Sequence, residues 1–237
     1  GIAVGEYYSC PQRPLSEKPL HALDILNKGI TVLRTEKKMS ACELNDFCNI
    51  TTLIFAAVSK ASIILPDKDT NFILKEYSRL GDRVIPSENR PIRPDDSTAV
   101  VCITLVNGLT RHVPPDLMPA LHHSDIFPGR TTGVPVKRTI NIRTNGSGRW
   151  ISTGLYALPG KKLTLAIEGN VPKDLVLRIG AHDDFLLYFN KKVTEWRRWP
   201  EVTVRMPLTT EKTVCASPHG GLVYIETPDG GSDCTIH

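Results

Sequence analysis

The sequence predicts an α+β protein, with a mixed α/β N-terminal region followed by an antiparallel β-sandwich-like module. Segments with one apolar helical face lie in the first half, and segments in which apolar and polar residues alternate fill the second. Glycine is unevenly distributed too, with five of the 17 glycines before residue 129 and twelve from there onward. We therefore expect two domains, residues 1–123 and 124–237, joined near the Pro- and Gly-containing loop 122–135.

Helices are expected over 20–26, 32–48 and 50–58, because their apolar residues fall on one helical face among strong helix formers. A further helix over 71–80 should end at Gly81, since glycine is a natural residue at a helix C-terminus.

Two β segments are expected in the same N-terminal region. Residues 61–65 follow a helical pattern with a short β-like run. Residues 99–106 read Ala-Val-Val-Cys-Ile-Thr-Leu-Val, which predicts the best buried strand of the chain. No reaction can be named from this half.

The second half predicts strands separated by turns. Alternation places apolar side chains on one face of each segment, as expected where one face packs and the other meets water. Several such strands at this spacing favour a β-sandwich. The strands are expected over 136–143, 163–167, 175–179, 202–206 and 222–225.

The composition is that of a globular protein, with 41% hydrophobic and 23% charged residues and a formal charge of +4. No apolar run reaches the roughly 18 residues of a membrane span, so no transmembrane segment is predicted. No nucleic-acid partner is predicted either, because a dense basic stripe is missing. Arg197-Arg198, flanked by Trp196 and Trp199, is interpreted as a Trp-anchored structural turn.

No residue pattern in the chain predicts catalysis. None of the seven histidines begins an H-E-x-x-H, and neither a G-x-S-x-G nor a catalytic cysteine frame occurs. A metal site of His112, His122 and Asp125 is conceivable, but surface-loop histidines are the favoured interpretation. Residues 182–184 (His-Asp-Asp) have the types of an acid/base pair and are interpreted as an Asp-rich turn. We therefore predict no catalytic, cofactor-binding or metal-binding residue.

Cysteines and sequons bear on the compartment. Two N-x-[ST] sequons make Asn49 and Asn145 candidate N-glycosylation sites. A secreted or extracellular protein is expected, with a cytoplasmic one as the alternative; disulfides follow in the first case and buried thiols in the second. The six cysteines are Cys10, Cys42, Cys48, Cys102, Cys215 and Cys234.

Five blocks of the second half resemble, in order, the N-terminal β-rich module of the enhancin-like (mucin-directed, peptidase M60-like) zinc metallopeptidases. The blocks cover about residues 124–237. They are Ser-Asp-Ile-Phe-Pro-Gly at 124–129, Trp-Ile-Ser-Thr-Gly-Leu-Tyr-Ala-Leu-Pro-Gly at 150–160, Leu-Arg-Ile-Gly-Ala-His-Asp-Asp at 177–184, Trp-Arg-Arg-Trp-Pro at 196–200 and Ala-Ser-Pro-His-Gly-Gly-Leu-Val-Tyr-Ile at 216–225.

The resemblance implies the non-catalytic portion of a peptidase acting on glycoprotein or mucin-like substrates. In the family a helical zincin half with H-E-x-x-H follows this module. No position here matches a zinc or catalytic residue, so no cofactor is expected in this chain, and zinc only if a downstream half exists. The chain ends within an alternating segment, so we expect a truncated module that associates with the rest of a larger polypeptide. The alternative is a scaffold that binds a protein or glycoprotein partner without proteolysis, as the resemblance to TRP-channel-associated factors implies.

Individual residues of the blocks are expected to maintain the fold. Trp150, Tyr156 and Trp199 are expected as large apolar anchors. Gly154 and Gly160 should bracket a hairpin-like turn that Pro159 pre-sets. Close backbone approach or turn formation is expected at Gly180 and at the pairs Gly220-Gly221 and Gly230-Gly231.

Overall fold

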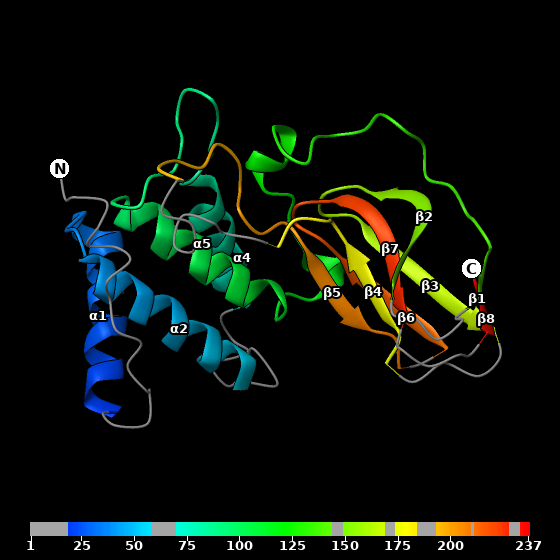
Figure 1. Ribbon diagram of the computed structural model, residues 1–237, viewed down its shortest axis with the longest axis horizontal. Helices are drawn as coiled ribbons and strands as arrows, with labels where there is room; N and C mark the ends of the chain where they lie inside the picture. Colours follow the sequence, from blue (N-terminus) through cyan, green and yellow to red (C-terminus); the bar gives the residue numbers. More distant parts are fainter. Residues whose placement is uncertain are drawn as a thin grey trace. The chain divides into compact units, whose positions relative to one another are not determined.

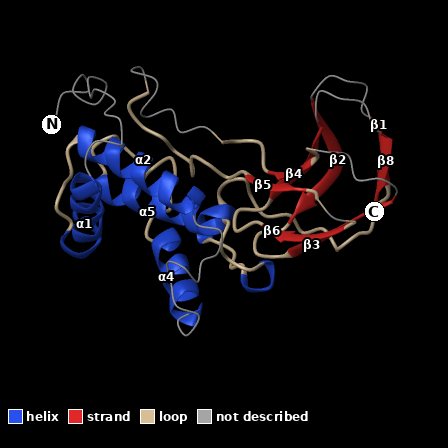
Figure 2. Ribbon diagram, turned by 90° about the horizontal axis from the view of Figure 1, so that it is seen from below, coloured by secondary structure: helices blue, strands red, loops and turns tan. Residues whose placement is uncertain are grey.

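The computed structural model describes residues 19–57, 70–143, 149–168, 174–183, 193–209, 211–227 and 233–237. These residues fall into two compact units. One unit holds the described residues up to Val113 together with 193–201, and the other holds the remainder. Helices occupy the first unit and antiparallel strands the second, so the predicted α+β class is confirmed (Figures 1 and 2).

The described part of the first unit contains four α-helices. The predicted helices at 20–26 and 71–80 are confirmed within longer elements, and the helix expected from residue 50 continues a preceding one. The helices are α1 (Pro19–Thr35), α2 (Ala41–Ala57), α4 (Thr70–Asp82) and α5 (Ser97–Thr110). Residues 61–65, expected to be β-like, lie outside the described residues.

The continuous helix predicted over 32–48 is wrong, because the chain breaks between α1 and α2. Glu36 has a φ of 58°, which ends the right-handed helix. Ser40 then begins α2 with a capping box: the Glu43 backbone N–H donates to Ser40 Oγ at 3.3 Å, and the Ser40 N–H donates to Glu43 Oε2 at 2.8 Å. The Ser-x-x-Glu spacing was the sequence signal for this start.

The strand predicted over 99–106 is also wrong, because these residues form the middle of α5. Asp96 caps this helix by accepting a hydrogen bond from the Ala99 N–H at 2.9 Å. Val100, Val101 and Cys102 are all fully buried, so apolar residues occupy successive positions around the helix. A helix buried on most sides shows no 3.6-residue period, and its sequence then resembles a buried strand.

Two glycines let the helices pack closely, because glycine has no Cβ atom. A Cβ at Gly29 of α1 would lie 2.2 Å from Phe47 of α2, and one at Gly108 of α5 would lie 2.2 Å from Phe55. Both phenylalanines are buried. The helical core is therefore built around aromatic rings that fit against glycine surfaces.

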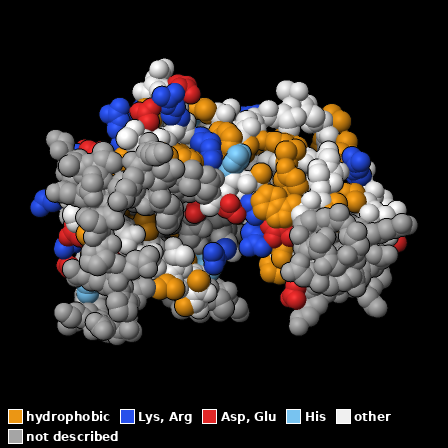
Figure 3. All heavy atoms as spheres, viewed as in Figure 1, with side chains coloured by type: hydrophobic (Ala, Val, Ile, Leu, Met, Phe, Trp, Pro, Cys, Tyr) orange, Lys and Arg blue, Asp and Glu red, His pale blue; other side chains and the backbone are white. Residues whose placement is uncertain are grey.

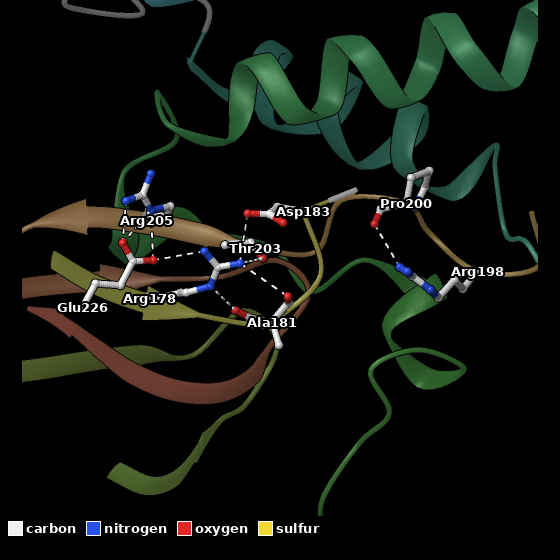
Figure 4. A network of polar contacts seen from close by, with 9 residues as sticks. Arg178, Ala181, Asp183, Arg198, Pro200, Thr203, Arg205 and Glu226 are labelled. Atoms are coloured by element: carbon white, nitrogen blue, oxygen red, sulfur yellow. Dashed lines mark hydrogen bonds and ion pairs between the residues drawn. The ribbon is translucent and has the colours of Figure 1, made fainter. Parts of the chain in front are cut away.

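The segment 193–201 lies in the helical unit, whereas its block at 196–200 was expected in the β-rich domain. Backbone hydrogen bonds pair Trp196 with Ile92 in both directions, at 2.7 and 2.8 Å. Trp199 is fully buried, and its indole N–H donates to Asn107 of α5 at 3.3 Å. Arg198 donates to the Pro200 carbonyl (Figure 4). It also donates to the Trp199 carbonyl. These contacts support the interpretation of the block as a Trp-anchored structural turn.

The second unit contains two four-stranded antiparallel sheets, ordered β1-β8-β3-β6 and β2-β7-β4-β5. One cluster of buried side chains draws on strands of both sheets, as in a β-sandwich. The strands are β1 (Ile140–Arg143), β2 (Arg149–Ala157), β3 (Lys162–Glu168), β4 (Val176–Ile179), β5 (Val204–Pro207), β6 (Lys212–Ala216), β7 (Gly221–Thr227) and β8 (Asp233–Ile236).

Two expectations about the strands need correction. The strand predicted over 136–143 is confirmed only from Ile140, and Val136 is exposed without strand pairing. The hairpin-like turn expected between Gly154 and Gly160 is wrong, because β2 and β3 belong to different sheets and the turn passes the chain between them. Gly154 instead lies inside β2, where the register with β7 shifts.

Among the described helices, none combines the length and the apolar character that crossing a membrane requires.

Candidate functional site

Four of the five family-like blocks meet at one end of the β-sandwich. A Cβ placed on Gly221 would lie 3.0 Å from Gly180 Cα and 3.9 Å from Pro128. A Cβ on Gly220 would lie 2.7 Å from the carbonyl oxygen of Ala157. These glycines therefore bring the blocks at 124–129, 150–160, 177–184 and 216–225 into direct contact, which we call the glycine junction.

Gly180 is the most constrained position of the glycine junction. Its φ is +86°, and a Cβ there would lie 2.4 Å from the carbonyl oxygen of Val202. The Gly180 N–H donates to the Leu222 carbonyl at 2.9 Å, which fixes the strand end. Both the backbone conformation and the lack of space require glycine. The expectation of a close approach at Gly180 is confirmed.

Two buried histidines lie beside the glycine junction. His123 and His219 are 1% and 2% exposed, and His219 Nδ1 lies 2.9 Å from His123 Nε2. One ring nitrogen donates and the other accepts, so this hydrogen bond needs at least one neutral ring. The turn before β7 holds His219 in place, because Ser217 Oγ accepts hydrogen bonds from the backbone N–H groups of His219 and Gly220.

Burial keeps both imidazoles neutral. Desolvation lowers the pKa of His123 to about 3; the Asp125 charge opposes this shift and His122 adds to it. Desolvation also lowers the pKa of His219 far below its ordinary value, and His123 acts in the same direction. A buried neutral pair of this kind favours a structural role over proton exchange with solvent.

The second feature is the outward face of the sheet β2-β7-β4-β5. In this sheet, side chains that alternate with the core residues point away from the sandwich core. Hydrophobic side chains reach the surface over the β-sheet unit, with basic and acidic side chains beside them (Figure 3). We call this surface the Trp150 face and define it by Trp150, Ser152, Arg178, Arg205, Tyr224 and Glu226.

Trp150, expected as a large apolar anchor, is 48% exposed on this face. One side of its ring is covered by the Arg178 guanidinium, whose Cζ lies 3.6 Å from the ring centroid. Tyr224 lies next to it, with ring centroids 5.8 Å apart and planes inclined by 50°. The other two aromatic anchors are placed differently: Trp199 is buried, and Tyr156 donates its hydroxyl to the Gly129 carbonyl.

Arg178 is a buried cation whose donors are engaged within the protein. Its side chain is 3% exposed. Its guanidinium donates to Glu226 Oε1 at 3.0 Å, to Asp183 Oδ2 at 3.0 Å and to Thr203 Oγ1 at 3.3 Å (Figure 4). The carbonyls of Gly180 and Ala181 accept further hydrogen bonds from it. A buried charge is tolerated only with such compensation.

Glu226 links the buried cation to a second, exposed one. Arg205 donates from Nε to both carboxylate oxygens of Glu226 at 3.1 Å. Burial acts to raise the pKa of the Glu226 carboxyl, but hydrogen bonds and charges of Arg205 and Arg178 outweigh it and hold this pKa below its ordinary value. Two cations and two anions, Asp183 included, thus make the cluster electrically balanced.

Several of the residues considered for metal binding or acid/base chemistry are engaged in other contacts. His112 hydrogen bonds with the Phe55 carbonyl in the helical unit, and Asp125 pairs with Arg130 in the other. Over the described residues, no group of three or more His, Cys, Asp or Glu side chains is arranged to hold a metal ion. Of residues 182–184, Asp183 pairs with Arg178, the His182 ring packs against Phe127, and Asp184 lies outside the described residues.

The structure describes only some of the candidate glycosylation sites and cysteines. Asn49 is exposed but stands in the middle of α2, whereas Asn145 and the pair Gly230-Gly231 lie outside the described residues. Four of the cysteines are free thiols: Cys42, Cys48, Cys102 and Cys215. Burial raises the pKa values of Cys48 and Cys102 to about 11 and that of Cys215 to about 12, so these three are poor nucleophiles at neutral pH.

Sequence reasoning missed the cluster around Arg178. The signal was an arginine at an alternating position between the apolar residues Leu177 and Ile179 of a predicted strand. In the sequence, a single charged residue at such a position looks like an ordinary solvent-facing residue. Its burial depends on Trp150 and Glu226, which lie on two other strands.

Comparison with known sequences decides the identity of the β-rich part. Residues 132–236 match the profile of the N-terminal domain of M60-like peptidases. This segment is an M60-like peptidase N-terminal domain. The family predicted from the five blocks is therefore confirmed.

The chain is also similar to curated proteins. The chain is 34% identical over 110 residues to TRPM8 channel-associated factor 3 of Rattus norvegicus, covering 45% of the chain and 12% of the relative. It is 27% identical over 150 residues to TRPM8 channel-associated factor 2 of Homo sapiens, covering 61% of the chain and 16% of the relative. The chain thus spans a small fraction of these proteins.

A solved structure shares the fold. The IMPa metallopeptidase from Pseudomonas aeruginosa matches with a TM-score of 0.52 and 15% identity, covering 80% of the chain and 22% of the enzyme. At this identity the likeness establishes the fold alone.

Replacing Gly180 with Ala should destabilise the protein far more than replacing Gly129. Gly129 also has a positive φ, of +101°, but nothing lies within 4 Å of its Cβ position. Gly129→Ala should therefore cost only about 1–2 kcal/mol of strain, whereas Gly180→Ala adds the clash with Val202 and should cost above about 3 kcal/mol. Urea unfolding of both variants measures this difference, and equal losses would contradict the role given to the junction.

Acid should destabilise the protein before its carboxylates are protonated. The pKa values of His123 and His219 are lowered in the folded state, so their stabilisation is complete above about pH 6.5, the unfolded value. It is lost progressively as the pH falls from there toward 3. The carboxyl of Glu226, whose pKa is also lowered, stabilises the fold fully above its ordinary value of 4.5, and this stabilisation is lost only as the pH falls below that value.

Urea midpoints measured between pH 7.5 and 4.5 test this assignment. We expect a steep fall for the wild type and a shallower slope for His219→Gln, which keeps a polar side chain but removes one titrating ring. An unchanged slope in this variant would contradict the account.

Proposed function

We propose that this chain is a non-catalytic portion of an enhancin-like metallopeptidase that acts on glycoproteins or mucin-like substrates. The observation that carries the proposal is the match of residues 132–236 to the M60-like N-terminal domain. In this role the domain supports a zinc-binding catalytic half that belongs to another part of the polypeptide. The likeness of fold to a metallopeptidase is consistent with it.

The described residues do not fit a zinc ion. They lack a suitable group of three ligands, and the buried histidines bind each other at 2.9 Å. Zinc in a peptidase needs three protein ligands and an open fourth position. The residues of this domain instead support a rigid frame, which holds neighbouring elements and carries the exposed Trp150 face.

The alternative function is a scaffold that binds a protein partner without proteolysis. The observation that favours it is that the curated relatives are channel-associated factors. Those proteins are named for an association and not for an activity. The peptidase function requires a zinc-binding catalytic half outside residues 1–237, whereas the scaffold function does not.

A secreted or extracellular location accompanies the peptidase proposal, because the substrates are glycoproteins of that compartment. The cytoplasmic alternative accompanies the scaffold. The free, buried thiols of Cys102 and Cys215 are compatible with either location, since buried cysteines serve as small apolar residues in both.

The decisive experiment compares this chain with the longest polypeptide that its reading frame encodes, both purified from the native host. We expect the longer polypeptide to contain H-E-x-x-H, to hold about one zinc per chain and to cleave an O-glycosylated protein. The 237-residue chain should hold no stoichiometric zinc and should not cleave. Intact mass before and after glycosidase treatment reports glycans at Asn49 or Asn145.

Each outcome decides between the functions. A longer polypeptide without H-E-x-x-H and without cleavage replaces the peptidase with the scaffold. One tightly bound zinc in the 237-residue chain contradicts the non-catalytic role. Unmodified asparagines with six free thiols place the protein in the cytosol and favour the scaffold.

A further inference from the structure

The Trp150 face has the features of a ligand-binding surface. The outer face of a sandwich sheet is ordinarily polar. Here Trp150 and Leu222 are 48% and 47% exposed, and Tyr224 is partly exposed between them. Exposed aromatic groups beside charged ones mark sites of interaction.

Trp150 is also held in a fixed orientation. Arg178 covers one ring face, and the guanidinium is itself fixed by Glu226, Asp183 and the surrounding carbonyls. The Trp150 side chain therefore has little conformational freedom to lose when a ligand binds to the exposed part of its indole. A preorganised group of this kind binds a ligand at low entropic cost.

The charges around the ring indicate an uncharged ligand. Arg178 and Arg205 are balanced by Glu226 and Asp183, and the ion pairs among them are already formed. An acidic or a basic partner gains no net attraction from such a cluster. Nucleic acids, acidic peptides and anionic sugars are therefore disfavoured.

The polar groups near the ring favour hydroxyl groups over an apolar protein surface. Glu226 lies directly opposite Trp150 across the strands, Ser152 follows on the same face, and Arg205 is 56% exposed beside Glu226. An apolar partner would have to desolvate these charges without replacing their hydrogen bonds. A hydroxyl group donates one hydrogen bond and accepts two, so it suits carboxylate, guanidinium and hydroxyl partners alike.

A sugar ring combines both requirements. One face of a pyranose consists of C–H groups and packs on the negative face of an indole, while its rim carries hydroxyl groups. We propose that the Trp150 face binds uncharged glycan chains of a glycoprotein, with the sugar on the exposed part of Trp150 and its hydroxyl groups on Arg205, Glu226 and Ser152. This rests on the proposed function, and assigns glycan recognition to the non-catalytic domain.

Binding to immobilised mucin in three forms tests the proposal: desialylated, natively sialylated and chemically deglycosylated. The probe is the 237-residue chain, followed by biolayer interferometry. We expect binding to the desialylated form and at least about tenfold weaker binding to the deglycosylated form. Affinity should change less than about twofold between 50 and 500 mM salt, because no net charge is involved. Sialylated mucin should bind no more tightly than the desialylated form.

Two variants place the site on the Trp150 face. Trp150→Ala should weaken binding at least about tenfold, as expected for a central aromatic contact, and Ser152→Glu should do the same by obstructing the face. Ser152→Glu leaves the Trp150–Arg178 stack in place, so its effect does not depend on a change in folding. Trp150→Phe should retain binding within about threefold. The matched control is Leu117→Ala, which removes an equally exposed side chain, 46%, outside this sheet.

The contrary outcomes are distinct. Equal binding to deglycosylated mucin that still depends on Trp150 identifies a protein-docking surface and overturns the proposal. A preference for sialylated mucin or a steep loss with salt overturns the choice of an uncharged ligand. Absence of binding, with cleavage by the longer polypeptide, overturns this inference and leaves the proposed function standing. Glycan binding by this chain, together with a longer polypeptide that lacks H-E-x-x-H, overturns the proposed function and leaves this inference standing.

Discussion

The burial of the Arg178 charge is the constraint on which the outer sheet face depends. A guanidinium that is 3% exposed needs compensation for nearly all of its donors. Two strands and the loop after β4 supply it: Glu226 from β7, Trp150 from β2, and the carbonyls and Asp183 that follow β4. The same requirement explains why an aromatic ring remains at the surface, because Trp150 covers the cation and is oriented by it.

A second constraint acts at the end of the same sheet. Gly180 closes β4 and also provides a carbonyl for Arg178, so the glycine junction and the charged cluster share one turn. Backbone contacts limit which side chains fit at the glycine junction, whereas ion pairs hold the cluster around Arg178 together. Together they account for most of the family-like blocks as architecture. In the described part of the chain, four of these blocks meet at the glycine junction.

Part of this structure was predictable from local sequence. The alternation of Leu163, Leu165 and Ile167 marks β3 because one of its faces packs in the sandwich core. The strand that ends before Gly180 and the strand that begins at Gly221 were predicted from the same alternation. By contrast, α5 was mistaken for a strand, because Val100, Val101 and Cys102 are all buried and the helical period is lost. The capping box at Ser40 was a readable signal for the break before α2.

The candidate site was less predictable than the fold. Trp150 was expected only as a large apolar anchor, and its partner Arg178 is distant in sequence and adjacent in space. The pairing of Arg178 with Glu226 depends on the β4–β7 register, which no local pattern encodes. Likewise, the contact between His123 and His219 joins residues that are 96 positions apart.

A double-mutant cycle between Arg178 and Glu226 tests the central claim most directly, using Arg178→Met, Glu226→Gln and the double variant. The account predicts a coupling energy above about 1.5 kcal/mol in urea unfolding, because both side chains are largely removed from water. The matched cycle with Asp183→Asn should give less than about 1 kcal/mol, because Asp183 is 61% exposed. A coupling to Glu226 no larger than the coupling to Asp183 would contradict the account.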